Sequence, residues 1–305
     1  MNSKPSLVRS EFLCGISIDI RSSRGFWCFS MKEVYFDTNV YDLLDELLQA
    51  KNFAPVNKLK RAIRSDQVRV YTNLVPIEET LGALKNQPVE GRRRLRLIKT
   101  LAKRKRMIRR HTEIIINDIS SYAKRERVKS KFMSPYPELK AVFQVRDLPG
   151  LVEVAEENRS HNRGFRDEMR DKLFQHIAPL AQPIIENKKV PQFEEYFEAN
   201  YRGVLEIIAD RAGYLEACRE RGIEGLLKIP SLNVAVRGQL SLTYANTFLG
   251  RLAQQGDSAD MQHAFIAVTV GTLVTEDKAL GKALKRANSP YLSIMNLQAL
   301  LDSLP

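Results

Sequence analysis

Four acidic residues stand where strands are expected to end or helices to begin. Asp37 follows the apolar run of residues 34–36, and Asp277 ends the short apolar stretch TLVTED. Glu78 and Asp260 fall near the starts of segments with helical apolar spacing. Because ligands of an open parallel sheet lie at the carboxyl ends of its strands, we expect these four carboxylates to converge on one edge.

Crowded carboxylates need a counter-charge, because like charges a few Å apart raise one another's pKa. A divalent cation removes that conflict. All-oxygen donors suit Mg²⁺ or Mn²⁺, whereas Zn²⁺ prefers Cys and His, which the sequence does not supply in a cluster. Such an ion can lower the pKa of a bound water and orient it toward a phosphodiester. The sequence therefore predicts hydrolysis of a nucleic-acid backbone.

Each of the four acids also has a purely structural alternative. Asp37 and Asp260 could cap helices, and Asp277 could be an ordinary turn residue. Glu78 lies in a first helical turn, where acids are favoured in any protein. The chemical interpretation therefore depends on the four acids occurring together and in order.

Short apolar segments alternate with helical patterns at the two ends of the chain. The segments EVYFDTNV, QVRVYTNLVP, GTLVTED and PYLSIM lie within residues 31–86 and 256–305. This alternation predicts a largely parallel central sheet covered on both faces, a three-layer α/β/α sandwich. Residues 87–255 show long helical patterns and predict an inserted all-helical subdomain. Residues 1–30 are expected to be an N-terminal extension.

The composition is that of an ordinary soluble protein. Of the 305 residues, 44% are hydrophobic and 28% are charged. No apolar run approaches the roughly 20 residues of a membrane helix, and charges interrupt any secretory apolar region near the start. The three cysteines match neither a disulfide framework nor a zinc-ligand pattern. We therefore expect a cytoplasmic protein with reduced, structural cysteines and no membrane association.

The positive charge is concentrated in one segment. The net charge is +12, and residues 85–110 contain twelve Lys or Arg against a single acid, Glu90. Such density suits nucleic acid, because each neutralised phosphate releases counterions. The alternative is a solvated helix face. The expected RNA-contacting residues are Arg92, Arg93, Arg94, Arg96, Lys103, Arg104, Lys105 and Arg106.

Four short motifs in order resemble the PIN-domain nucleases, a family that includes the toxin halves of many toxin and antitoxin pairs. The motifs are FDTNV, IEETLGA, ADMQHAFIA and TED, and the resemblance covers residues 31–84 and 256–305. Each motif is unspecific alone, and the order within strand and helix contexts carries the resemblance. It implies a PIN-like fold with metal-dependent ribonuclease activity. The long helical insertion departs from the family and bears on substrate and partner.

The resemblance also implies roles for individual residues. Asn39 and Thr275 match positions that hold the acids by hydrogen bonds, and Thr38 lies beside them as a supporting residue. Hydrolysis is expected to leave a 5′-phosphate and a 3′-hydroxyl. The acids that match the family's four, and that would hold Mg²⁺ or Mn²⁺, are Asp37, Glu78, Asp260 and Asp277.

Three neighbouring residues compete with these assignments. Glu78 lies four residues before Gly82, which fits the family's spacing, so we prefer it over the adjacent Glu79. Asp257 is an alternative to Asp260, although helix capping is its simpler role. His263 lies one turn after Asp260 and could reach a metal, but a lone His on a mostly apolar helix is more often packed or solvated. We therefore leave His263 out of the expected site.

The sequence as a whole predicts an endoribonuclease that depends on Mg²⁺ or Mn²⁺. One alternative is a non-catalytic PIN-like module that binds RNA or protein. A less favoured one is a phosphatase of the haloacid dehalogenase type, which needs a second Asp two positions after the first, where this chain has Asn39. The expected partners are RNA and an antitoxin-like or other acidic protein, and a homodimer is a further option.

Overall fold

A computed structural model describes most of the chain after residue 30. The described ranges are 31–84, 86–102, 107–134, 190–250 and 257–305, together with residues 142, 149–150, 152–153 and 156–157. Residues 31–305 form one compact unit. The expected N-terminal extension, residues 1–30, lies outside the described residues, as do Lys103, Arg104, Lys105 and Arg106.

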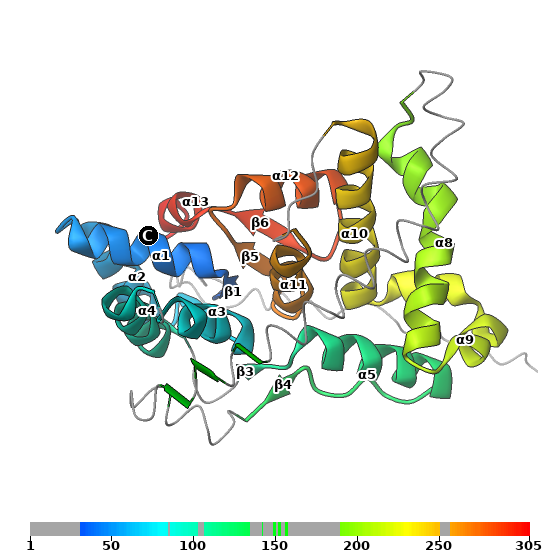
Figure 1. Ribbon diagram of the computed structural model, residues 1–305, viewed down its shortest axis with the longest axis horizontal. Helices are drawn as coiled ribbons and strands as arrows, with labels where there is room; N and C mark the ends of the chain where they lie inside the picture. Colours follow the sequence, from blue (N-terminus) through cyan, green and yellow to red (C-terminus); the bar gives the residue numbers. More distant parts are fainter. Residues whose placement is uncertain are drawn as a thin grey trace, which may run out of the picture. The chain divides into compact units, whose positions relative to one another are not determined.

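A four-stranded parallel sheet forms the centre of the unit (Figure 1). Its order is β2–β1–β5–β6, with each strand parallel to its neighbours. The sheet confirms the expected mixed α/β class with a parallel sheet. The strands are β1 (Lys32–Phe36), β2 (Val68–Tyr71), β5 (Thr272–Val274) and β6 (Ser293–Met295).

The two faces of the sheet bury different side chains, because successive strand residues point to opposite sides. Val34, Phe36 and Val70 belong to one core cluster. Tyr35 and Tyr71 belong to another. Helices supply most of the remaining members of both clusters, so both faces of the sheet are covered. The helices next to the strands in sequence are α1 (Thr38–Gln49), α2 (Ala54–Arg64), α3 (Leu74–Leu84), α11 (Asp257–Ala267), α12 (Lys278–Ala287) and α13 (Leu297–Asp302).

The region expected to be an all-helical insertion is mostly helical but also contains strands. A two-stranded antiparallel ladder pairs Met107 with Met133 and Ile108 with Phe132. This ladder corrects the all-helical prediction, and each of its strands is too short to show a period in the sequence. The elements are α4 (Pro88–Leu101), β3 (Met107–Ile108), α5 (His111–Lys124), β4 (Phe132–Met133), α8 (Phe193–Arg211), α9 (Leu215–Arg221), the 3₁₀ helix η1 (Ile223–Lys228) and α10 (Pro230–Phe248).

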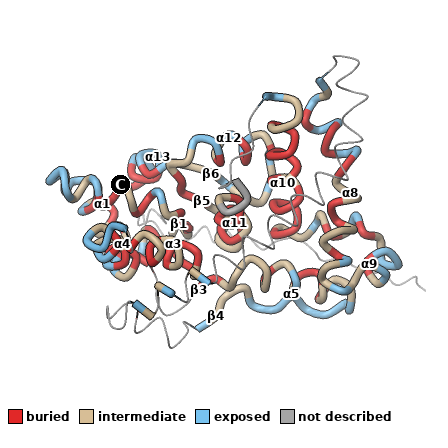
Figure 2. Tube along the Cα trace, viewed as in Figure 1, coloured by how far each residue is buried: buried red, intermediate tan, exposed pale blue. Residues whose placement is uncertain are grey.

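Two helices of this region share the cores of the sheet. Leu95 and Ile98 of α4 are buried in the cluster that contains Val34. Val234 and Leu242 of α10 are buried in the cluster on the other face. Figure 2 shows α10 buried along most of its length. The α/β core therefore continues into residues 87–255. No described helix has the length and apolar character that crossing a membrane requires.

A close helix approach explains a glycine in α4. A Cβ atom built on Gly91 would lie 2.7 Å from Cδ2 of Leu84 and 3.3 Å from its Cα. Real Cβ atoms do not approach other carbons this closely without movement of the neighbour. Gly91 thus allows α4 to pack tightly against the end of α3. In contrast, a Cβ on Gly203, within α8, would meet nothing within 4 Å.

We predict opposite effects for Ala at these two glycines. Both substitutions gain helix propensity, which should stabilise Gly203→Ala by about 0.5–1 kcal/mol. Gly91→Ala adds a steric clash in a packed core and should destabilise the protein by about 1–3 kcal/mol. Chemical denaturation of the two variants and the parent measures both effects. Equal stabilisation by both substitutions would show that α3 and α4 are not in tight contact at Gly91.

Candidate carboxylate site

Asp37 lies at the carboxyl end of the central strand β1 and is almost fully buried, with 2% of its surface exposed. Its side chain caps α1, because Oδ1 accepts a hydrogen bond from the Val40 amide at 3.1 Å. Its other oxygen, Oδ2, accepts a hydrogen bond from the Thr275 hydroxyl. The expected helix-capping role and the expected support from Thr275 therefore occur together at one buried carboxylate.

Thr275 connects Asp37 to the end of the neighbouring strand β5. Its hydroxyl oxygen also accepts a hydrogen bond from the Asp277 amide at 3.0 Å. The Asp277 side chain caps α12, accepting from the amides of Ala279 at 2.7 Å and Leu280 at 2.9 Å. Asp277 thus lies at the expected sheet edge, but its carboxylate is engaged in capping.

The adjacent acids of α3 separate into two environments. Oε2 of Glu79 accepts a hydrogen bond from the Thr38 hydroxyl and lies 3.4 Å from Nε2 of His263. Oε1 of Glu78 instead accepts a hydrogen bond from Arg110 Nη2 at 2.7 Å. The structure therefore groups Glu79 with Asp37 and places Glu78 in an ion pair with α5. The two side chains face different partners because consecutive helical residues differ in direction by about 100°. The spacing of the motif alone did not show which of the two faces Asp37.

His263, which the sequence analysis left out, is part of this group. Its ring is 3% exposed, and Nδ1 lies 3.0 Å from the Tyr35 hydroxyl. Asp260, three residues earlier on α11, is partly exposed and close enough to influence the pKa of His263. The signal available in the sequence was the presence of His263 among the apolar residues of this helix. Asp257 belongs to α11, but its side chain lies outside the described residues.

The remaining supporting residue, Asn39, is exposed in the first turn of α1. It therefore does not share the burial of Thr275, the other residue expected to hold the acids. The group that the structure brings together consists of Asp37, Thr38, Glu79, His263 and Thr275, and we name it the carboxylate site.

Burial dominates the electrostatics of the carboxylate site. Desolvation, with a smaller contribution from the charge of Glu79, raises the pKa of Asp37 to about 6, although His263, Thr275 and the Val40 amide act in the opposite direction. Burial also lowers the pKa of His263, but Glu79, Asp37 and Asp260 together raise it above its usual value. Burial therefore outweighs the hydrogen bonds and the neighbouring His263 in setting the pKa of Asp37.

The donor set suits a hard divalent cation. Asp37 and Glu79 offer carboxylate oxygens, and Mg²⁺ is commonly held by one or two carboxylates while it keeps several waters. A cation in contact with Asp37 would stabilise the ionised carboxylate, which burial disfavours. Among the described residues, no three His, Cys, Asp or Glu side chains form a ready-made metal site. The fit therefore rests on a carboxylate pair rather than on four converging acids.

Comparison with known proteins adds no assignment. The chain matches no protein-family model, no curated protein and no solved structure.

The arginines expected to contact RNA are divided by the packing of α4. Arg93 reaches back to α1, where Nε lies 2.8 Å from Oδ1 of Asp45, a side chain only 5% exposed. Arg94 pairs with Asp42 of α1 at 2.8 Å. Arg92 and Arg96 are exposed. Half of the described arginines in the expected set therefore connect two helices, which the spacing of basic residues did not reveal.

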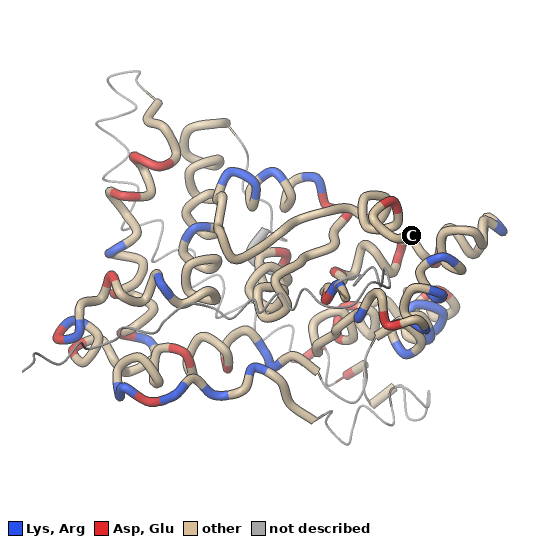
Figure 3. Tube along the Cα trace, turned by 180° about the vertical axis from the view of Figure 1, so that it is seen from behind, with Lys and Arg blue, Asp and Glu red and all other residues tan. Residues whose placement is uncertain are grey.

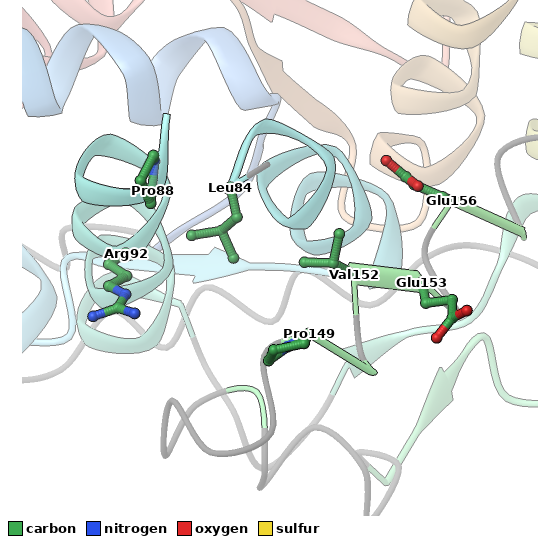
Figure 4. A pocket seen from close by; sticks show the side chains of 7 residues that line it. All are labelled: Leu84, Pro88, Arg92, Pro149, Val152, Glu153 and Glu156. Carbon is green, nitrogen blue, oxygen red and sulfur yellow. The ribbon is translucent and has the colours of Figure 1, made fainter. Parts of the chain in front are cut away.

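A pocket of about 500 Å³ lies beside α4, away from the acids (Figure 4). Its floor is largely apolar, and charged side chains stand at its sides. The lining includes no member of the carboxylate site, so the candidate chemistry does not take place there. The lining residues are Leu84, Pro88, Arg92, Pro149, Val152, Glu153 and Glu156.

Asp37→Asn should stabilise the metal-free protein at neutral pH. A folded-state pKa of about 6, against 3.8 for an ordinary Asp, means that stability falls as pH rises from about 4 to about 6. Asn removes this loss while its oxygen can still accept from the Val40 amide. We expect a gain of about 1–3 kcal/mol above pH 7 and little difference below pH 4.

Urea denaturation of parent and variant in EDTA, at several pH values between 4 and 8, measures this gain. The exposed Asp302, which accepts a hydrogen bond from Gln298, provides a control, and Asp302→Asn should show no such pH dependence. If the difference in unfolding free energy between the parent and Asp37→Asn were the same at pH 4.5 and pH 7.5, Asp37 would not be a desolvated carboxylate.

Arg93→Gln should destabilise the fold, whereas Arg96→Gln should not. Removing Arg93 leaves the buried Asp45 without its cation, which we expect to cost about 1–3 kcal/mol given the partial exposure of Arg93. Substitution of the exposed Arg96 should change the free energy of unfolding by less than about 0.5 kcal/mol. Denaturation curves of the two variants compare them directly. Identical midpoints would mean that the ion pair does not contribute to folding.

Proposed function

We propose that this protein is a metal-dependent ribonuclease with a PIN-like fold. The observation that carries the proposal is the buried Asp37 at the carboxyl end of the central strand, with a pKa raised by desolvation and by Glu79. In the absence of a cation, a carboxylate in this position lowers the stability of the fold. Ionisable groups with strongly shifted pKa values occur most often at functional sites. Hydrolysis of a phosphodiester by a metal-activated water is a chemistry that an ion held by such a pair can supply.

The arrangement of the sheet supports the PIN-like part of the proposal. Asp37 follows β1, Thr275 and Asp277 follow β5, and these two strands are parallel neighbours. The acids from two strand ends therefore lie on the same edge, as ligand sites do in open parallel sheets. Helices covering both faces match an α/β/α sandwich.

The residues of the carboxylate site divide the work between binding and orientation. Asp37 and Glu79 would hold the ion, and Thr275 and Thr38 would orient their carboxylates. Asp260 is a further ligand candidate beside them. When bound, Mg²⁺ or Mn²⁺ supplies a water of lowered pKa and positive charge against the phosphoryl oxygens. Glu78, paired with Arg110, and Asp277, which caps α12, have supporting positions in this assignment.

RNA is the substrate class that the charge distribution favours. Arg92 and Arg96 remain exposed on α4, and α12 adds Lys278, Lys282 and Lys285, all exposed and at spacings that place them on one helical face. Figure 3 shows this basic stretch of α12 as well as the basic residues of α4. Because α12 begins directly after Asp277, its lysines can hold a phosphate backbone beside the acids, whose own charge would repel it.

A second candidate is a non-catalytic PIN-like module that binds RNA or an acidic protein such as an antitoxin. The observation that favours it is the engagement of the acids by groups of the same chain: His263 faces Glu79, Arg110 binds Glu78, and Asp277 caps α12. The phosphatase alternative gains no support, since Asn39 stands exposed where a second Asp would be needed.

Cleavage of a labelled single-stranded RNA tests the two candidates. We expect the full chain to cleave with Mn²⁺ and not in EDTA, leaving ends that carry a 5′-phosphate. Asp37→Asn and Glu79→Gln should each lower the rate more than about 100-fold, because even outer-shell residues of metal sites cost 10–100-fold. Unimpaired RNA binding without any cleavage would favour the non-catalytic module.

Glu78→Gln is the matched control for Glu79→Gln, with the same chemical change one residue away. It should keep activity within a few-fold of the parent, since its carboxylate lies in the pair with Arg110. An inactive Glu78→Gln together with an active Glu79→Gln would return the second ligand to the position that the family resemblance implied.

A further inference from the structure

We infer that Tyr35 and His263 are positioning residues that hold the Glu79 carboxylate beside Asp37. This inference rests on the proposed function, because it assigns to the two residues a part in metal binding. It concerns a buried line of polar groups that starts on β1, passes through α11 and ends on α3.

The line is continuous, and its two inner members are closed to solvent, whereas the Glu79 side chain at its end is 25% exposed. The Tyr35 hydroxyl lies 3.0 Å from Nδ1 of His263, and Nε2 on the other side of the ring lies 3.4 Å from Oε2 of Glu79. Tyr35 is 0% exposed and His263 is 3% exposed. With both ring nitrogens facing protein groups, the imidazole is not placed to contact a substrate, which distinguishes it from a catalytic base.

The chemistry of the groups determines which atoms along the line donate hydrogen bonds and which accept them. A neutral imidazole has one N–H donor and one acceptor nitrogen. In the neutral ring the Tyr35 hydroxyl, which remains protonated inside the core, donates to Nδ1 and the ring proton lies on Nε2. In the protonated ring, which the neighbouring carboxylates favour, Nδ1–H donates to the Tyr35 oxygen instead. In both states Nε2 carries a proton that faces Glu79, and Tyr35 anchors the opposite side of the ring.

Glu79 needs this support because its neighbour is negatively charged. Repulsion between Asp37 and Glu79 favours rotation of Glu79 away from the strand end. Two donors oppose that rotation: Thr38 from the first turn of α1, and His263 from α11. Both reach the same oxygen, Oε2, so together they fix the position of that oxygen.

Metal ligands in proteins are commonly oriented by such outer partners, whose loss costs about 10–100-fold in metal affinity or activity. The usual arrangement is a carboxylate that orients a metal-binding histidine. Here the order is reversed, because a histidine and a tyrosine orient a carboxylate. The same histidine shares a helical face with Asp260, so its anchoring to Tyr35 also sets how deeply that part of α11 packs.

Tyr35→Phe tests the inference with the loss of a single oxygen. The chain offers a matched control in Tyr71, which is 3% exposed on the neighbouring strand, stands opposite Tyr35 in register, and donates to a different carboxylate, Glu33, at 2.7 Å. Tyr71→Phe loses an equivalent hydrogen bond outside the carboxylate site. A second variant, His263→Gln, keeps an amide donor for Glu79 but loses the ring.

Two measurements are made on the full-length parent and on each variant. The first is the ¹⁵N NMR spectrum of the histidine rings in the metal-free protein. We expect Nε2 of the parent His263 to carry a proton at every pH at which the protein is folded, and we expect the Nδ1 resonance to shift in Tyr35→Phe but not in Tyr71→Phe. A parent ring that carries its proton only on Nδ1, or that averages between tautomers, would overturn the inference whatever the metal does.

The second measurement is the affinity for Mn²⁺ without RNA, by calorimetric titration. We expect Tyr35→Phe to bind at least about 10-fold more weakly than the parent, with His263→Gln between them. Tyr71→Phe should stay within about twofold of the parent, because its hydroxyl donates to Glu33, which is not part of the carboxylate site. If Tyr35→Phe lowers only the unfolding temperature and leaves the Mn²⁺ affinity unchanged, the line is structural and the inference is wrong.

The two measurements also separate this inference from the proposed function. A parent that binds no Mn²⁺ refutes metal-dependent catalysis and with it the positioning role, even if Nε2 carries a proton. A parent that binds Mn²⁺ and cleaves RNA, with Tyr35→Phe indistinguishable from it in both measurements, leaves the function standing and removes the role of Tyr35 and His263.

Discussion

The burial of one carboxylate organises the carboxylate site. Asp37 follows β1 inside the protein, where an isolated charge would lower the stability of the fold. The surrounding groups supply hydrogen bonds that reduce this loss. The first turn of α1 turns an amide toward it, and Thr275 from the next strand offers a hydroxyl. The start of α1, the end of β5 and, through His263, the helix α11 thus each bring a group that stabilises the Asp37 carboxylate.

The packing around this point also explains how the helical region relates to the sheet. α4 lies over one core and α10 over the other, so both hydrophobic faces of a small sheet are completed by segments that come between its second and third strands in sequence. Arg93 and Arg94 contribute to this packing, because their ion pairs hold α4 against α1.

Much of the fold followed from the sequence, because its signals are local. Short apolar segments between helical patterns predicted the four strands, and the capping role of Asp37 was among the alternatives considered. Asp277 was expected to be a ligand or a turn residue, and the structure shows it capping α12. Other features depend on the direction in which single side chains point, and the spacing of apolar residues along the sequence does not predict that direction. Glu78 and Glu79 have the same chemistry and differ by one position on a helix, and His263 gains its place only through the distant Tyr35. The two-residue strands β3 and β4 are too short to leave a pattern.

The sheet order has a consequence for how the chain folds during synthesis. Strand β1 pairs on one side with β2 and on the other with β5, and the hydrogen bond from Thr275 to Asp37 joins residues 238 positions apart. Contacts of such long range form late, because the entropy of closing the loop is lost before the contact gives any return. The edge of β1 that later receives β5 is therefore unpaired while the ribosome makes the intervening residues, a period of about 10–50 s at 5–20 residues per second. An unpaired central strand is a hazard for aggregation, which makes this protein a candidate client for chaperones that bind nascent chains.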